Sequence, residues 1–520
     1  MTTEYDDIIV GGGSVGCWLA HRLMSTDARR VLLIEAGPDV ATRAALPTDQ
    51  LQGNFARFSC DWGLTMEGGG LAPASYPLAR ILGGGSSING AAALRALPAD
   101  FADWSASCGE YWSWKAVAPH FAAIENDATG SGAIPISRCA TEDRHPVAAA
   151  FVEGSRRLGF AVCADFNEGD IGGVGSMPMN LIDNRAWSAA ELLYAARERP
   201  NFTLLTQTQA ERVVFNGQAA VGVEVLGPDG LQRITGGRIV LAAGAIHSPA
   251  ILMRSGVGHA PELLKAGVAP LFERRGIGRG LQDHPGVGFW SPPRPDQMPI
   301  RCAIQKQSLL RLSSRMLGVD DGDPFDLQIY LMLDIGIVGT EIERMLPGPR
   351  ANLMTAVLLR PRGSGNVRLT GPSTAHKPRI QLDFLSHPSD RQRLRESTRL
   401  LWRLSQDKRL AAHMGPFAFW TESTLQDDRR LDDALRVVTR TAFHPTGTAR
   451  MGPESDPDTV VDERGAVHGI AHLFVADLSI MPVSPRSTTN VTSMMLGHRL
   501  GSMLSQANPP ERLDRTTFLI

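Results

Sequence analysis

Three glycines and one glutamate near the start of the chain have the types and spacing that hold a dinucleotide. Gly11, Gly13 and Gly16 form a G-x-G-x-x-G run. The first allows a tight turn, the second lets backbone amides approach a pyrophosphate, and the third lets a helix pack closely on a sheet. Glu35 lies where it can accept both hydroxyls of an adenosine ribose, and its charge disfavours the 2′-phosphate of NADP. These residues predict an adenine dinucleotide and leave FAD and NAD equally open.

A β-α-β unit must position these four residues. Residues 7–10 and 31–34, which are apolar apart from Asp7, predict two strands, and helix signals follow the glycine loop through Leu23. The phosphates then lie at the helix N-terminus, where free N–H groups and the helix dipole favour negative charge. Ser14 at the helix start and Ala36 after Glu35 complete the predicted contacts.

Composition narrows the class of protein. With 520 residues, at roughly 150 per domain, the chain should form two or three domains. A net charge of −2 without a long basic run argues against nucleic acid as a partner, and six scattered cysteines without a C-x-x-C pair give no metal site. The chain enters a predicted strand at once, which leaves no room for a signal peptide. The longest apolar stretch, residues 239–253, is too short and too interrupted to cross a membrane. We therefore expect a cytoplasmic enzyme.

Strand and helix patterns continue beyond the first unit. Alternating small and β-branched residues predict strands of the dinucleotide-binding sheet at 202–206, 212–215, 222–226 and 238–242. A second sheet is predicted from 326–333, 351–359 and 365–369, with an amphipathic helix over 388–410.

Two further glycine-containing segments carry chemical information. Residues 80–90 contain the run Leu-Gly-Gly-Gly-Ser-Ser-Ile-Asn-Gly, which exposes backbone amides and small hydroxyls where a planar ring must approach the chain. Residues 244–258 form another small-residue segment that opens with Gly-Ala-Ile-His-Ser-Pro. Each segment alone is also compatible with a structural turn.

Taken with three later segments, these motifs resemble one family. The later segments are Gly-Arg-Gly-Leu-Gln-Asp-His at 278–284, His-Pro-Thr-Gly-Thr-Ala-Arg-Met-Gly at 444–452 and Ala-Asp-Leu-Ser-Ile-Met-Pro at 476–482. In this order the chain resembles the glucose-methanol-choline (GMC) oxidoreductases, and within them bacterial aryl-alcohol and hydroxymethylfurfural oxidase-type members. The resemblance implies FAD as cofactor and oxidation of an alcohol to a carbonyl.

The resemblance also assigns residues to FAD. The first glycine loop and Glu35 should hold the pyrophosphate and the adenosine ribose, and Ala210 should meet the adenine through its backbone. The stretch from Arg80 to Gly90 should pass the flavin. Asp477 should lie near the ribityl-pyrophosphate portion, and Val491 and Thr492 should offer amides to the pyrimidine end of the ring. The cofactor residues implied within the stretch are Arg80, Gly84, Ser86, Asn89 and Gly90.

Two residues carry the implied catalysis. His444 matches the base of the family, and Asn490 matches a partner position that other members fill with His or Asn. A neutral imidazole can accept the hydroxyl proton while hydride moves to flavin N5, and Asn490 can orient the hydroxyl. After transfer, a protonated His444 would also favour superoxide beside the reduced flavin. A helix N-cap is the alternative role for Asn490, since Asn favours that position.

Some positions depart from the family pattern or allow two interpretations. Ile88 stands where some members attach the flavin through a histidine, so non-covalent FAD is expected. Gly280 and Leu78 replace residues that are polar or basic in many members. Phe443 is expected either as a pocket wall or as an ordinary buried side chain. An aromatic cluster at 417–420 fits either the substrate cavity or the core.

The predicted fold is α/β (α+β overall), with a Rossmann-like FAD-binding domain and a substrate-binding domain built on an antiparallel sheet with helices. We assign 1–150, 200–290 and 440–520 to the FAD-binding domain and 151–199 and 291–439 to the substrate-binding domain. The predicted function is a flavin alcohol oxidase that converts a primary, aromatic or apolar alcohol to an aldehyde and reduces O₂ to H₂O₂. A dehydrogenase that uses a quinone or another acceptor and a hydroxynitrile lyase-type flavoprotein are the alternatives.

Overall fold

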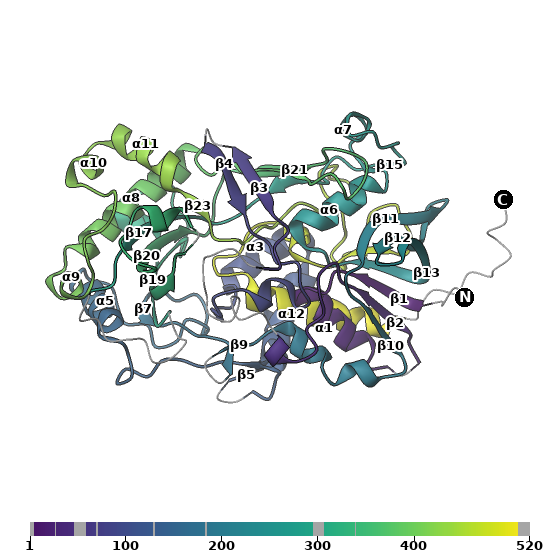
Figure 1. Cartoon of the computed structure of the whole chain (residues 1–520), viewed down its shortest axis with the longest axis horizontal. Coiled ribbons are helices and arrows are strands. Elements are labelled where there is room, and N and C mark those ends of the chain that lie inside the picture. Colours follow the sequence, from purple (N-terminus) through teal and green to yellow (C-terminus); the bar gives the residue numbers. More distant parts are fainter. Residues whose placement is uncertain are drawn as a thin grey trace.

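The chain folds around two main sheets at opposite ends of an elongated molecule (Figure 1). The computed structural model describes residues 5–26, 28–45, 59–68, 71–127, 130–182, 185–294, 306–338 and 340–507. One sheet is mostly parallel at its centre and the other is antiparallel throughout. This arrangement confirms the predicted fold class.

The first sheet contains the strand that leads into the first glycine loop. Its strands, in spatial order, are β10 (Phe202–Leu205), β2 (Val31–Ile34), β1 (Tyr5–Val10), β13 (Gly230–Leu241), β12 (Ala219–Gly227) and β11 (Gln209–Asn216), and β24 (Leu473–Val475) also pairs with β13. Strands β10, β2, β1, β13 and β24 run parallel, whereas β12 and β11 extend β13 as an antiparallel hairpin. Strand β2 is buried along its whole length, as expected for a parallel strand covered on both faces. All six strands predicted for this sheet are confirmed.

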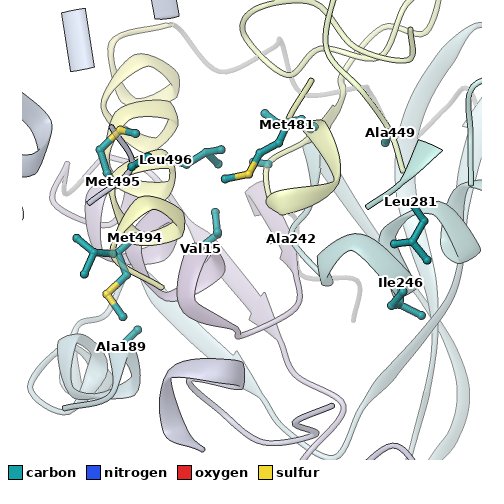
Figure 2. Close-up of a cluster of buried hydrophobic side chains, with 14 of the residues drawn as sticks. Val15, Ala189, Ala242, Ile246, Leu281, Ala449, Met481, Met494, Met495 and Leu496 are labelled. Atoms are coloured by element: carbon teal, nitrogen blue, oxygen red, sulfur yellow. The ribbon is translucent and has the colours of Figure 1, made fainter. Parts of the chain in front are cut away.

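A pair of helices from the two ends of the chain packs together beside this sheet. The first, α1 (Ser14–Leu23), lies against α12 (Asn490–Gln506) (Figure 1). Gly497 allows the two helices to approach closely, since a Cβ at this position would lie only 2.8 Å from the carbonyl oxygen of Val15. Figure 2 shows Val15 in one apolar cluster with Leu496 of α12 and Met481. The start of α12 is thereby held near the first glycine loop.

The second sheet is antiparallel and is covered by helices. Its strands, in spatial order, are β23 (Arg440–Thr441), β17 (Pro285–Ser291), β20 (Arg350–Leu358), β19 (Leu327–Gly336), β18 (Ser308–Leu312) and β7 (Gly173–Ser176). The helices around it are α5 (Pro146–Arg157), α8 (Pro388–Ser405), α9 (Lys408–His413), α10 (Glu422–Gln426) and α11 (Asp428–Val438) (Figure 1). The single helix predicted over 388–410 was wrong in length. It ends at Ser405, because the Asp407 side chain accepts the amides of Arg409 and Leu410 and starts α9.

The described residues also form a third, smaller sheet and four further helices. The sheet contains β16 (Arg279–Leu281), β21 (Gly365–Arg368), β22 (Arg379–Gln381), β3 (Leu64–Gly68) and β4 (Leu71–Tyr76), and the helices are α3 (Pro98–Cys108), α4 (Trp114–Ile124), α6 (Gly244–Arg254) and α7 (Ala260–Lys265). The strand predicted at 365–369 is therefore present as β21, but its assignment to the second sheet was wrong, because it pairs with β16 and β22. Across the described part of the chain, no helix has the length and apolar character needed to cross a membrane. The division into two domains stays a prediction. Strand β17, which crosses the predicted border between residues 290 and 291, pairs with β20 in the second sheet.

Candidate active site

The first glycine loop is built so tightly that two of its positions exclude a side chain. Gly11 has φ +107°, and a Cβ there would lie 2.6 Å from the carbonyl oxygen of Ala242, the residue after β13. A Cβ on Gly16 would overlap the carbonyl oxygen of Gly11. Gly13, in contrast, has open space where its side chain would be, and it precedes the first turn of α1. The first amides of α1 have no intrahelical acceptor and no side-chain cap, so they are available to an anion.

Glu35 ties this loop to the end of β2. Its Oε2 accepts the amide of Gly12 at 2.9 Å, and its Oε1 accepts the amide of Gly37 at 2.7 Å. Burial raises the pKa of this carboxyl, while the two amides and Arg80 oppose that shift. Together with Ala36, Glu35 lines the cavity described below. The carboxylate is therefore fixed in place before any ligand binds.

The second glycine segment lies directly on the first loop. The amide of Gly83 donates to the carbonyl of Gly12 at 2.7 Å. A Cβ on Gly84, which has φ +53°, would lie 2.7 Å from the Cα of Gly13. Gly84, Asn89 and Gly90 line the same cavity as the first loop. The two segments thus form one continuous backbone surface.

Two predicted cofactor residues of this segment lie away from the cavity wall. Ser86 is buried, where its hydroxyl donates to Gly83 and accepts the amide of Ala189, so it fixes the turn. Arg80 is exposed, and its guanidinium lies 5.0 Å from the centroid of the Trp62 ring. The contacts of these two residues with the cofactor stay predictions.

One cavity of about 750 Å³ joins the glycine segments to the predicted catalytic residues. Its wall includes Gly13, which precedes α1, and Glu35, which follows β2, and it continues to His444 and Asn490. Gly11, Ser14, Ala210 and Asp477 line it as well. Most of the predicted site residues are thereby brought together on one surface, although they come from segments almost 500 positions apart in the sequence.

Asp477 and Ala210 are held by the elements around them. Asp477 Oδ2 accepts the amide of Gly244 at 2.9 Å and the hydroxyl of Ser248 at 2.5 Å, so it binds the start of α6. Burial raises the pKa of Asp477. Ala210 lies in β11, and its carbonyl accepts from the Arg254 guanidinium at 3.2 Å.

Val491 and Thr492 do not reach the cavity with their side chains. Both are buried, and the Thr492 hydroxyl accepts the amide of Ala96 at 3.0 Å. They occupy the first turn of α12, whose leading N–H groups have no intrahelical acceptor. Neighbouring Thr489, Asn490 and Ser493 line the cavity, so the helix start faces it.

His444 is positioned by a buried carboxylate that the sequence motifs contained but to which no role was assigned. Asp283 Oδ1 accepts the amide of His444 at 2.9 Å and that of His284 at 2.7 Å. Its Oδ2 accepts the hydroxyls of Tyr76 and Thr441, each at 2.5 Å. Four donors on one fully buried carboxylate fix the loop that carries His444.

The residue before His444 has a strained backbone. Phe443 has φ +64°, a left-handed conformation that is costly for a residue with a bulky side chain. The Thr441 hydroxyl accepts the Phe443 amide at 2.7 Å and stabilises this conformation. Phe443 lines the cavity, which favours the pocket-wall interpretation. The strain and the Asp283 bonds together direct the loop into the cavity.

The His444 ring contacts a second histidine. The Nδ1 atoms of His444 and His284 are 2.9 Å apart, so one ring donates and the other accepts. Burial, followed by the positive charge of Lys306, lowers the pKa of His444 to about 3. His284 is fully buried, and burial lowers its pKa well below the ordinary value. Both rings are therefore neutral at pH 7, consistent with one N–H donating to one ring nitrogen.

Asn490 carries an unused polar atom. It is the first residue of α12, the N-cap position belongs to Thr489, and its Nδ2 is buried with no partner among the described residues. The N-cap role considered for Asn490 is therefore wrong, because the N-cap is the preceding residue. A buried amide nitrogen without an acceptor is costly, and a ligand oxygen in the cavity would satisfy it.

The aromatic cluster at 417–420 divides between the two expected roles. Phe419 lines the cavity, whereas Trp420 is buried and stacks on Phe289 with ring centroids 4.8 Å apart. Phe417 also packs on Phe289.

Sequence reasoning missed three residues around His444. Asp283 and His284 end the Gly-Arg-Gly-Leu-Gln-Asp-His segment, and the adjacent acid and histidine were the signal that could have identified them. Lys306 belongs to no motif, so only its position in the cavity wall reveals it.

The fold and this cavity define a dinucleotide-binding oxidoreductase, and comparison with known proteins identifies the family. Two family models described as GMC oxidoreductase match residues 5–286 and 361–497, so the chain belongs to the GMC oxidoreductase family. It is 32% identical to 5-(hydroxymethyl)furfural oxidase from Methylovorus sp. (strain MP688), over 97% of this chain and 99% of that protein. It is 30% identical to an oxygen-dependent choline dehydrogenase from Brucella anthropi, over 99% and 98% of the two chains.

Solved structures agree with this assignment. Pyridoxine 4-oxidase from Mesorbium loti superimposes with a TM-score of 0.88 and 29% identity, over 97% of this chain and 100% of that one. A fungal aryl-alcohol oxidase superimposes with a TM-score of 0.82 over 97% and 99%, and at 22% identity it supports the fold alone.

The chain is therefore an FAD-dependent oxidoreductase of this family. The residues present fit the cofactor. Gly13 leaves open space in the cavity wall, and the amides that begin α1 and α12 are free for anionic oxygen. The fixed Glu35 carboxylate suits ribose hydroxyls.

Proposed function

We propose that this protein oxidises a primary, aromatic or otherwise apolar alcohol to an aldehyde, with His444 as base and O₂ as the final oxidant. One observation carries this proposal: a single cavity runs from the dinucleotide-binding loops to a neutral histidine and an unpartnered amide. The named activities of relatives, among them the furfural oxidase and the pyridoxine oxidase, support it.

The two cavity residues have different roles in this reaction. Bound FAD would supply the acceptor for the hydride that leaves the alcohol carbon. Asn490 Nδ2 donates to the substrate oxygen and holds the hydroxyl toward His444. His444 accepts the hydroxyl proton, which makes hydride loss from carbon favourable. Because the lowered pKa keeps His444 neutral, the base is ready at neutral pH.

The pair of histidines specifies which nitrogen of His444 accepts the proton. For a free acceptor nitrogen in the cavity, His444 must carry its own proton on Nδ1 and donate to Nδ1 of His284. His284 then carries its proton on Nε2. That Nε2 is buried and has no hydrogen-bond partner among the described residues.

We further propose that FAD is held without a covalent bond. Ile88, whose side chain cannot form such a bond, lines the cavity beside Asn89. Denaturation in acid should therefore release all of the yellow cofactor into the supernatant. Cofactor that stays with the precipitated protein would contradict this part of the proposal.

An alcohol panel tests the function most broadly. Aryl and aliphatic primary alcohols are offered to the FAD-loaded protein, and oxygen uptake, H₂O₂ and dye reduction are measured in parallel. We expect oxygen uptake matched by H₂O₂ and strongest with aryl alcohols. Fast dye reduction with negligible oxygen uptake would instead identify a dehydrogenase.

A lyase is the candidate from another reaction class. An anaerobic substrate that bleaches the flavin identifies redox chemistry, whereas a flavin that stays yellow while a cyanohydrin is cleaved identifies the lyase. The two outcomes exclude each other for a given substrate.

A further inference from the structure

Lys306 places a positive charge in the wall of the substrate end of the cavity. It precedes β18, and its Nζ lies 5.6 Å from the centroid of the Tyr330 ring in β19. On the other side it contacts Gly90 so closely that a Cβ on Gly90 would collide with Nζ. Its charge also contributes to the lowered pKa of His444. The ammonium group thus lies between the second glycine segment and the predicted base.

This cation has no protein partner in the described part of the chain. No hydrogen bond or ion pair of Lys306 is formed there, and burial alone lowers its pKa to about 8. The other two cationic side chains of the cavity wall are satisfied, because Arg254 donates to Ala210 and Glu211 and Arg440 donates to Val437 and Thr439.

The carboxylates of the cavity wall are occupied elsewhere. Glu35 accepts two backbone amides, and Asp477 accepts one amide and one hydroxyl at the start of α6. Neither of them contributes to the charge environment of Lys306. The Lys306 side chain is half-buried, and an ammonium held partly out of water without an anion is costly, so an anion supplied by a ligand would relieve a cost already present in the fold.

The surfaces beside Lys306 are apolar and aromatic. Met332 and Leu353 pack with Trp290 and Tyr330, and all four side chains line the cavity. Such a wall binds an apolar ring, whereas the one ammonium group binds an anion. Together they describe a ligand with an apolar body and a single negative group.

We propose that Lys306 binds a carboxylate on the substrate, which makes this protein selective for alcohols that carry a carboxylate at the far side of an apolar or aromatic body. The inference rests on the proposed alcohol oxidation and names its substrate class. Lys306 touches the substrate but takes no part in the transfer of proton or hydride.

A pair of substrates that differ in charge tests the inference. Anaerobic flavin reduction is followed with 4-(hydroxymethyl)benzoate and with 4-methylbenzyl alcohol, in the native FAD-loaded protein, Lys306→Met and Lys306→Arg. We expect Lys306→Met to raise the half-saturating concentration of the acid about tenfold or more, as for loss of a hydrogen bond to a charged group. The value for the neutral alcohol should change much less than the value for the acid, and Lys306→Arg should restore part of the preference. Lys408→Met, at an exposed position in α9, is the matched control for loss of one positive charge.

A ligand that cannot react separates this inference from the proposed function. Titration with 4-methylbenzoate, followed by the flavin absorbance spectrum, should show binding to the native protein and loss of binding in Lys306→Met. If neither alcohol reduces the flavin but this titration behaves as expected, the proposed function fails and the carboxylate site stands. Equal losses for the acid and the neutral alcohol in Lys306→Met, or no binding of 4-methylbenzoate to the native protein, would overturn the inference.

Discussion

The two ends of the cavity are built by different means. At the dinucleotide end, backbone contacts backbone, and glycines at 11, 16 and 84 allow approaches that a side chain would block. At the catalytic end, a buried carboxylate gathers four donors and holds a loop in a strained conformation. The first design tolerates no added atoms at these three glycines, and the second tolerates no lost hydrogen bonds. Substitutions at the two ends should therefore fail in different ways.

The largest effect is expected from Gly16→Ala at the dinucleotide end. The added methyl group would overlap the carbonyl oxygen of Gly11, so α1 must move away from the sheet. We expect a loss of about 3 kcal/mol in the free energy of unfolding and a protein purified without FAD. Thermal unfolding and the ratio of absorbance at 450 and 280 nm measure both effects.

Gly13→Ala is the matched comparison within the same loop. Its methyl group meets no protein atom within 4 Å and points into open space. The apoprotein should therefore unfold at an almost unchanged temperature, while FAD binds more weakly. Equal destabilisation of the two apoproteins would contradict the difference drawn between these glycines.

The next effect is expected from Asp283→Ala at the catalytic end. It leaves four buried donors without their acceptor and releases the loop of Phe443 and His444. Because a misplacement of about 1 Å can cost about 100-fold in rate, we expect a decrease of that order in the rate constant of flavin reduction. FAD content should stay near that of the native protein. An unchanged rate constant would show that the carboxylate does not position the base.

A smaller effect of the same kind is expected from Tyr76→Phe. It removes one of the four donors to Asp283 and leaves the hydrogen bond from the His444 backbone amide intact. The rate constant of flavin reduction should decrease by less than about tenfold, the size of one ordinary hydrogen bond, because three donors still hold Asp283. A decrease as large as that of Asp283→Ala would mean that Tyr76 acts in some other way.

The smallest effect is expected from pH. The pKa of His444 is lowered to about 3 by burial and by Lys306, so the ring is neutral above that value and would be protonated only below it. The rate constant of flavin reduction by a neutral alcohol should therefore show no rise near the ordinary histidine pKa of about 6.5. A step at that pH would contradict a base held neutral by its surroundings.

The same contrast explains what could be predicted from the sequence. The spacing of Gly11, Gly13 and Glu35 specifies local backbone geometry, so the β-α-β unit and the dinucleotide were predictable from that spacing. His444 and Asn490 were predicted only through resemblance to a family, because no local pattern connects residues that the tertiary fold brings to one cavity. Asp283 was missed for the same reason, since its partners Tyr76 and Thr441 lie far away in sequence.

Element ends and single contacts were the least predictable. The helix over 388–410 divides because Asp407 caps a new helix, which the hydrophobic period does not reveal. Arg80 was assigned to FAD as part of a motif, yet it is exposed beside Trp62. Lys306 belongs to no motif, and its meaning depends on the cavity around it.

The central claim is that His444 is the base at one end of a cavity whose other end holds FAD. Its most direct test is anaerobic flavin reduction by an aryl alcohol in His444→Ala, compared with the native protein at matched FAD content. The substitution removes the imidazole ring and leaves the hydrogen bond from the backbone amide of residue 444 to Asp283. We predict retained FAD and a rate constant lower by about 100- to 10,000-fold, the range for loss of a general base. Retained FAD with a near-native rate constant would contradict the account.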